Sequence, residues 1–122
     1  MTAATTDIKT PINVLHIDDD EQQSNLLASY LGHLNEQISV TALDDPTTAL
    51  QTVEQHNIDC IVCDYQMPEM DGIEVLRATR KRYPNIPFFL LTGKGSETVA
   101  SEATDAGVTS YIQKGGNEVY EQ

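Results

Sequence analysis

Short apolar runs alternate with longer amphipathic stretches along this chain. The short runs are rich in β-branched residues and are typical of strands buried on both faces, whereas the longer stretches space their apolar residues as helices do. This alternation predicts a parallel sheet with helical crossovers, a doubly wound α/β fold, and leaves the strand order open. Strands are predicted at 12–17, 38–43, 58–63, 86–91 and 108–112, and helices at 21–34, after Asp45, at 71–83 and at 96–106.

The expected ends of two helices carry suitable residues. Asp45 can cap the second helix, with Pro46 in its first turn, and Gly107 is suited to ending the last predicted helix. On the first helix we expect one apolar face, which consists of Leu26, Leu27, Tyr30, Leu31 and Leu34.

Composition and charge narrow the classes of function. The 122 residues, 39% of them hydrophobic, are typical of one globular domain, which we place at 11–122 after a polar, flexible leader at 1–10. Nineteen acidic and seven basic side chains give a formal net charge of -12, which argues against direct binding to nucleic acid or to an anionic membrane. The sequence has neither a membrane-spanning run nor a secretory signal, so the cytoplasm is the expected compartment.

Two cysteines, Cys60 and Cys63, have the Cys-x-x-Cys spacing of thioredoxin-type redox sites. Reactive pairs of this kind lie at the start of a helix. These two lie in a predicted strand, where side chains three residues apart point to opposite faces. We therefore expect two small core residues and no redox site.

Polar side chains follow the predicted strands at their carboxyl ends, where sites form in open parallel sheets. Carboxylates after the first and third strands crowd together if those strands are neighbours. Mg²⁺ relieves such crowding because it binds carboxylates, water and phosphate oxygens. The alternative is that the first three aspartates only cap a helix, a role we expect for Asp20 or Glu21 alone. The polar residues at the strand ends are Asp18, Asp19, Asp20, Asp64, Thr92 and Lys114.

Asp64 is the candidate nucleophile of this group. A carboxylate can attack phosphorus and form an acyl phosphate when a cation neutralises the incoming oxygens. The Thr92 hydroxyl and the Lys114 ammonium could then bind phosphoryl oxygens. Each is weak on its own, because a lone Thr is more often a turn or cap residue and a lone Lys after a strand is more often a surface group.

Four segments resemble the receiver domains of response regulators in two-component signalling. The resemblance implies a flavodoxin-like strand order 2-1-3-4-5, in which the first and third strands are neighbours, as the metal hypothesis requires. It also implies a signalling module that catalyses only its own phosphorylation and dephosphorylation, and so is not a metabolic enzyme. The segments are NVLHIDDDE, DCIVCDYQMPEMDG, FFLLTGKG and GVTSYIQKG, and the resemblance spans 12–114.

Carried over onto the matching positions, the resemblance implies that Asp64 is the phosphorylation site. Asp18, Asp19 and Asp64, together with the backbone carbonyl of Gln66, would bind Mg²⁺, or Mn²⁺ in its place. A sensor histidine kinase or a phosphotransfer protein would supply the phosphoryl group, and an output domain or a downstream protein would respond to it.

The resemblance also implies a switch. Thr92 and Lys114 would hold the phosphoryl group, and Tyr111 would follow the Thr92 hydroxyl to change the surface of the fourth helix and fifth strand. The alternative for Tyr111 is an edge-strand aromatic that simply packs on the fourth helix.

The chain departs from the family's pattern after Lys114. Gly115 and Gly116 stand where the family usually has proline, and glycine does not enforce a cis peptide bond. The segment after the fifth strand is too short for a full last helix, so we expect a truncated one and an uncovered apolar flank on strands four and five. A version extended beyond Gln122 is expected to be more stable.

Two other functions remain open from the sequence. A pseudo-receiver would serve only as a protein-binding surface, but such domains typically lose the acceptor or the acidic pair. A Mg²⁺-dependent phosphohydrolase would also use an aspartyl phosphate. It would want a second acid–base carboxylate near Asp64 and a cap insertion, and Tyr65 and Gln66 supply neither.

Overall fold

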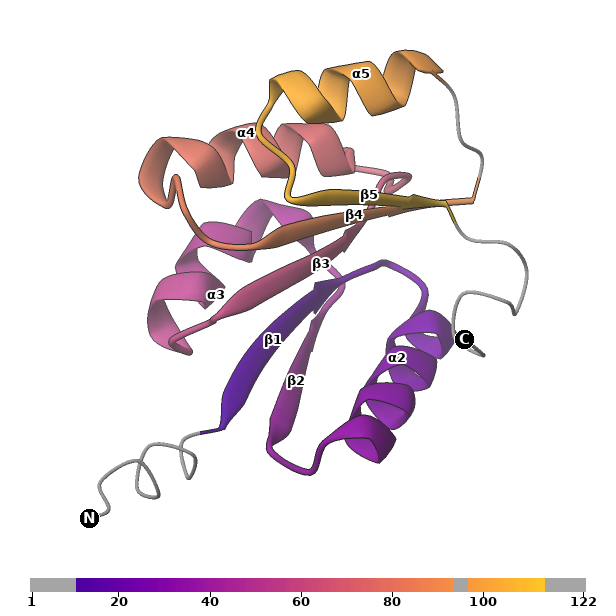
Figure 1. Cartoon of the computed structure of the whole chain (residues 1–122), viewed down its shortest axis with the longest axis vertical. Coiled ribbons are helices and arrows are strands. Elements are labelled where there is room, and N and C mark those ends of the chain that lie inside the picture. Colours follow the sequence, from indigo (N-terminus) through magenta and orange to yellow (C-terminus); the bar gives the residue numbers. More distant parts are fainter. Residues whose placement is uncertain (1–10, 94–96, 114–122) are drawn as a thin grey trace.

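The computed structural model describes residues 11–93 and 97–113, which form a five-stranded parallel sheet with helices on both faces (Figure 1). The strand order is β2-β1-β3-β4-β5, which confirms the predicted doubly wound, flavodoxin-like fold. The predicted leader at 1–10 lies outside the described residues. The elements are β1 (Ile12–Ile17), α2 (Glu21–Leu34), β2 (Ile38–Leu43), the 3₁₀ helix η1 (Pro46–Thr48), α3 (Ala49–Gln55), β3 (Cys60–Asp64), α4 (Gly72–Arg82), β4 (Phe88–Thr92), α5 (Glu97–Asp105) and β5 (Ser110–Gln113).

The register of the central strands brings their carboxyl ends together. At the end of β1, Ile17 pairs with Cys63 of β3, and the next residue of β3, Asp64, pairs with Leu91 of β4. Thr92 follows directly as the last residue of β4. Because all four strand pairs are parallel, the residues at these ends share one edge of the sheet.

The main core lies on the face of the sheet that α3, α4 and α5 cover. Alternate strand residues point to opposite faces, so this face takes every second side chain of β1, β3 and β4. No helix in the described part of the chain is long and apolar enough to cross a membrane. The core residues include Leu15, Ile17, Ile61, Cys63, Phe88 and Leu90 from the strands and Val53, Ile73, Leu76 and Ala103 from the helices.

The opposite face carries α2 and an apolar groove. Figure 1 shows α2 on the other side of the sheet from α3 and α4. Beside α2 a groove of about 280 Å³ runs across the strands. The expected truncated last helix would fall after Gln113, outside the described residues, so the uncovered flank stays a prediction. The groove is lined by Val14, Cys60, Val62, Phe89, Leu91 and Ile112 of the sheet and by Leu27, Tyr30 and Leu31 of α2, with Ile38 at its edge.

The predicted helix caps are confirmed, and the apolar face of α2 is only partly buried. Asp45 accepts a hydrogen bond from the Thr47 N–H at the start of η1, and Gly107 has a positive φ of 93° just after α5. On α2, however, Leu26 is 43% exposed and Leu34 is 63% exposed. Leu27, Tyr30 and Leu31 line the groove beside the sheet, whereas Leu26 and Leu34 do not.

Three predicted strands begin two residues later than expected. The strand predicted from residue 108 begins at Ser110, because the Val108 N–H donates to the Ala103 carbonyl in the turn after α5. The strand predicted from Ile58 begins at Cys60, since the Ile58 N–H donates to Val53 and the Asp59 carboxylate accepts from the Asn13 N–H. The strand predicted from residue 86 begins at Phe88, because the residue before it is a proline, which has no N–H for the ladder.

Arg80 of α4 links three segments that are distant in sequence. Its Nε donates to the carbonyl of Gly107 over 2.8 Å, and its Nη1 donates to the carbonyls of Tyr83 and Ile86 over 3.0 and 2.7 Å. A guanidinium offers five N–H donors in a rigid fork, so one side chain can satisfy several carbonyls. The end of α4, the approach to β4 and the turn after α5 are thereby held together.

Gly72 and Gly32 should respond in opposite directions to replacement by alanine. A Cβ at Gly72 would lie 2.5 Å from Leu90 Cδ1 and 2.6 Å from the carbonyl oxygen of Asp64, whereas a Cβ at Gly32 in α2 meets nothing within 4 Å. We expect Gly72→Ala to lower the free energy of unfolding by about 1–3 kcal/mol through overpacking. Gly32→Ala should raise it by roughly 0.5–1 kcal/mol. Urea denaturation measures both, and equal effects would contradict the predicted difference.

Candidate functional site

Three carboxylates meet at the carboxyl edge of the sheet. One oxygen each from Asp18, Asp19 and Asp64 lies within 4.8 Å of the other two. Asp18 and Asp64 are buried, at 3% and 8% exposure, while Asp19 is exposed. The structure therefore brings together the three aspartates that the sequence singled out, two of them shielded from water.

The three consecutive aspartates after β1 have different local roles. The Asp18 N–H donates to the Leu43 carbonyl over 3.0 Å and so extends the pairing of β1 with β2. Its Oδ1 accepts from the Asp20 N–H over 2.9 Å. Asp20 in turn caps α2, because its Oδ1 accepts from the Gln22 N–H over 3.0 Å. The capping role falls to Asp20, as expected, which leaves the first two aspartates at the site.

The loop after β3 fixes the backbone on both sides of the third aspartate. The Tyr65 N–H donates to the Leu91 carbonyl over 2.8 Å, and the Tyr65 carbonyl accepts from the Gly72 N–H over the same distance. Asp71 and Glu74 then form a reciprocal capping box at the start of α4, with both bonds at 2.9 Å. The chain thus returns to β3 within a few residues and leaves the carboxylate at the sheet edge.

The trio suits a hard divalent cation. Clustered carboxylates repel one another, and burial strengthens that repulsion because less water screens it. All three offer oxygen ligands, which Mg²⁺ and Mn²⁺ prefer. Asp19 also lines two open depressions, of about 380 and 510 Å³, that leave room for metal-bound water and a phosphate. Gln66 lines the larger one, and its carbonyl as a ligand stays a prediction.

The predicted phosphoryl-binding residues are only partly within the described chain. Thr92 is buried at the end of β4, one residue beyond the partner of Asp64 in the sheet. Lys114 lies outside the described residues, so its position stays a prediction. Asp64 at the end of β3 and Thr92 at the end of β4 therefore place a carboxylate and a hydroxyl on neighbouring strands.

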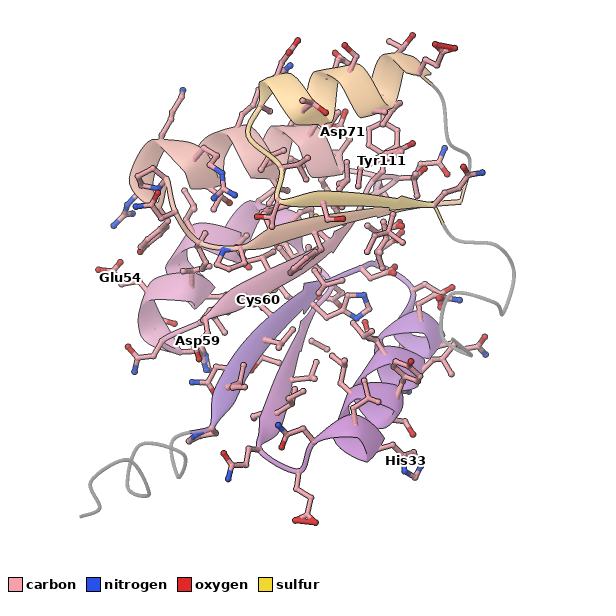
Figure 2. The ribbon with its side chains drawn as sticks, viewed as in Figure 1. His33, Glu54, Asp59, Cys60, Asp71 and Tyr111 are labelled. Carbon is pink, nitrogen blue, oxygen red and sulfur yellow. The ribbon has the colours of Figure 1, made fainter. Side chains whose placement is uncertain are left out.

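Tyr111 of β5 packs against the core with its hydroxyl buried. It pairs in register with Leu90 of β4. Figure 2 shows its side chain on the side of the sheet where α5 lies, and Asp71, at the start of α4, lies on the same side. Among the described residues its hydroxyl oxygen has no hydrogen-bond partner. This placement agrees with an aromatic that packs under the helical layer, and the switching role stays a prediction.

His16 was missed by the sequence reasoning. It lies in β1, fully buried, and its Nε2 is 3.7 Å from Asp18 Oδ2. The signal in the sequence was a single imidazole inside the otherwise apolar run Val14 to Ile17, two residues before the first aspartate.

The two cysteines form no redox site. Both are free; Cys63 is buried in the main core, and Cys60 lines the apolar groove on the other face, as a strand predicts for side chains three apart. Burial, and next the negative charge of Asp59, raise the pKa of Cys60 to about 11. Burial, and then the charge of Asp64, also raise the pKa of Cys63 well above its ordinary value.

The model of the family described as "Response regulator receiver domain" matches residues 14–119. The chain belongs to the response regulator receiver family. Among curated proteins, this receiver domain is 33% identical over 105 residues to the chemotaxis protein CheY of Pseudomonas aeruginosa, with 84% of each chain covered. It is 30% identical over 105 residues to the cyclic di-GMP phosphodiesterase response regulator RpfG of Xanthomonas campestris. That match covers 84% of this receiver domain but only 28% of the relative's length.

Solved structures agree with the family. The chemotaxis protein CheY4 of Vibrio cholerae superposes on this receiver domain with a TM-score of 0.82 and 25% identity. The alignment covers 92% of this chain and 93% of that one. The five-stranded order and the acidic trio therefore occur here in the fold of a CheY-like receiver, a class of signalling module.

Removing one charge from the trio should stabilise the metal-free receiver domain. Asp19 is the best position for this substitution, because it is exposed, so replacing it by Asn removes the charge without disturbing buried packing. In a chelating buffer, we expect Asp19→Asn to raise the free energy of unfolding by about 1 kcal/mol, the energy of two unit charges 4–5 Å apart in water.

Glu36→Gln is the matched control, since it removes the same charge from an exposed position at the other end of α2. Its effect should stay below about 0.5 kcal/mol. Urea denaturation measures the free energy of unfolding of both variants. Equal changes in the two would show that the three carboxylates do not repel one another appreciably.

Cys60 should react slowly with thiol reagents. A thiol with a pKa of about 11 is roughly one per cent thiolate at pH 9, where a thiol of the ordinary pKa of 9.0 is half ionised, so alkylation should be about 50-fold slower than in the unfolded chain. Iodoacetamide labelling of Cys63→Ala, folded and in urea, isolates Cys60. Equal rates in the two states would show that burial does not raise its pKa.

Proposed function

We propose that this receiver domain accepts a phosphoryl group on Asp64 in a Mg²⁺-dependent reaction, with Mn²⁺ able to replace Mg²⁺. The observation that carries the proposal is the buried carboxylate of Asp64 within 4.8 Å of two further carboxylates at an open edge of the sheet. The match of the family model over residues 14–119 supports it. A divalent cation held by Asp18, Asp19 and Asp64, with the Gln66 carbonyl, would neutralise phosphoryl oxygens as they approach.

Asp64 is the member of the trio best suited to be the acceptor. Asp18 has a neighbour at each oxygen, the Asp20 N–H at Oδ1 and His16 at Oδ2, which suits a fixed ligand. Asp19 is exposed, so water competes for it. Asp64 ends the central strand β3 beside β4, whose last residue carries a hydroxyl.

The reaction transfers a phosphoryl group from nitrogen to oxygen. An Asp64 carboxylate oxygen forms a bond to phosphorus while the phosphorus–nitrogen bond of a phosphohistidine donor breaks, and the electron pair leaves with the imidazole. The donor is a sensor histidine kinase or a phosphotransfer protein. Thr92 and Lys114 bind phosphoryl oxygens, and hydrolysis of the acyl phosphate later resets the domain.

Phosphorylation would act on the surface of α5 and β5. The phosphoryl group adds about −1.5 to −2 charge and strong acceptors beside Thr92. A hydroxyl drawn toward those acceptors leaves space that Tyr111, two strands from Asp64 across β4, can occupy. A downstream protein or an output domain would read the altered surface.

One added phosphoryl group per chain is the expected result when the protein is incubated with acetyl phosphate and Mg²⁺. Intact-mass spectrometry measures it, because acetyl phosphate carries the same transferable group as the protein donor. The adduct should disappear in Asp64→Asn and when Mg²⁺ is chelated, and it should persist in the surface control Glu36→Gln.

The same measurement separates the alternatives. Absence of any adduct on the unaltered chain would favour a pseudo-receiver that only binds protein, and an adduct that survives Asp64→Asn would place the acceptor elsewhere. Steady turnover of small phosphate esters would favour a phosphohydrolase.

A further inference from the structure

His16 occupies a position that core packing alone does not explain. It lies in β1 between Leu15 and Ile17 and is fully buried, although an imidazole is costly to bury among apolar side chains unless it interacts with a polar partner. Its Nε2 faces Asp18 Oδ2 over 3.7 Å, longer than a hydrogen bond but close enough for the two polar groups to interact. The side chain therefore adjoins one of the three carboxylates from inside the protein.

Strand geometry puts the imidazole and the carboxylate on the same face. Residues two apart in a strand point to the same side, so His16 sits directly behind Asp18 as β1 reaches the sheet edge. In the sheet His16 pairs with Ala42 of β2 and Val62 of β3, so strands flank it on both sides. The backbone of His16 is thereby fixed in the sheet, and its side chain is fully buried.

The carboxylate of Asp18 has a neighbour at each oxygen. The Asp20 N–H donates to Oδ1 over 2.9 Å, and His16 Nε2 lies 3.7 Å from Oδ2, beyond hydrogen-bond distance. A polar ring beside the second oxygen limits the rotation about the Cβ–Cγ bond that the single hydrogen bond at Oδ1 leaves open. Limiting this rotation matters, because Mg²⁺ demands nearly ideal octahedral geometry and tolerates misplaced ligands poorly.

We propose that His16 is a positioning residue for the cation site, which orients the Asp18 carboxylate toward Asp19 and Asp64. The inference rests on the proposed function, since it assigns His16 to the same cation. Groups behind the metal ligands commonly change metal affinity by 10- to 100-fold when they are removed, although they never touch the metal. His16 contacts neither the phosphoryl group nor the cation and acts only through Asp18.

The competing explanation is a structural pair, in which His16 only satisfies the buried Asp18. Both explanations predict a change in stability when His16 is replaced, so stability cannot separate them. Cation affinity can, because a structural pair leaves the affinity of a correctly folded variant unchanged.

The test measures the dissociation constant for Mg²⁺ alone by isothermal titration calorimetry, on the whole chain at one pH, together with urea denaturation in chelating buffer. His16→Leu keeps an apolar side chain of comparable size and removes the polar contact, and we expect it to bind Mg²⁺ at least about tenfold more weakly. His16→Val makes the same test with a residue that favours strands, in case the leucine does not fit. His16→Gln retains an N–H donor and should stay within roughly threefold of the unaltered chain.

His33→Gln is the matched control, because His33 is exposed at the far end of α2, away from Asp71 and Tyr111 at the site edge (Figure 2). It should leave the Mg²⁺ affinity unchanged. Folded His16→Leu or His16→Val that binds Mg²⁺ as tightly as the unaltered chain would overturn the inference and leave the proposed function intact. Equal losses in His16→Gln and His16→Leu would also overturn it, since the polar contact would then be irrelevant. An unaltered chain that binds no Mg²⁺ would overturn the inference and the proposed function together.

Discussion

Repulsion among three carboxylates is the constraint that the rest of this structure must oppose. Asp18 and Asp64 are nearly excluded from water and Asp19 lies against them, so the chain holds like charges together where solvent screens them little. No isolated loop could maintain such an arrangement. It persists because Asp64 ends β3 and because Asp18 and Asp19 directly follow β1, the strand that pairs with β3.

The core supplies the rigidity that this arrangement needs. Leu15, Ile17 and Ile61 are fully buried just before the two strands end, so the strand residues that precede the aspartates are packed into the main core. Beyond the strands, the Tyr65 N–H bonded to Leu91 and the close approach of Gly72 to the backbone of β3 confine the loop. Stability and chemistry are thus coupled: the apolar strand interiors stabilise an edge that, without a cation, is electrostatically unfavourable.

Much of this was readable from the sequence because the signals were local. β1, α2 and β2 have the predicted bounds, since each is a long periodic segment with a recognisable cap or turn at its ends. The aspartates could be found because strand ends are chemically distinct from strand interiors. Strand order needed the family resemblance, because pairing between distant segments leaves no mark in the alternation itself.

The sequence was a poor guide where contacts between distant segments determine burial and the bounds of an element. Leu26 and Leu34 have the helical spacing of core residues, yet both are exposed. The start of β3 depends on which partner accepts each N–H near Ile58, a matter of spatial neighbours. His16 escaped notice because one polar residue in an apolar strand has no meaning until the side chain two positions later is seen to share its face.

The fork that Arg80 makes has a mechanical consequence for α5. The turn at Gly107, just beyond the last residue of α5, is hydrogen-bonded to α4 through the Arg80 guanidinium. The other end of α5 comes soon after Thr92, the last residue of β4. The Arg80 hydrogen bonds hold the C-terminal end of α5 to α4 and to the approach to β4, so a shift of α5 against the sheet is resisted most strongly at that end.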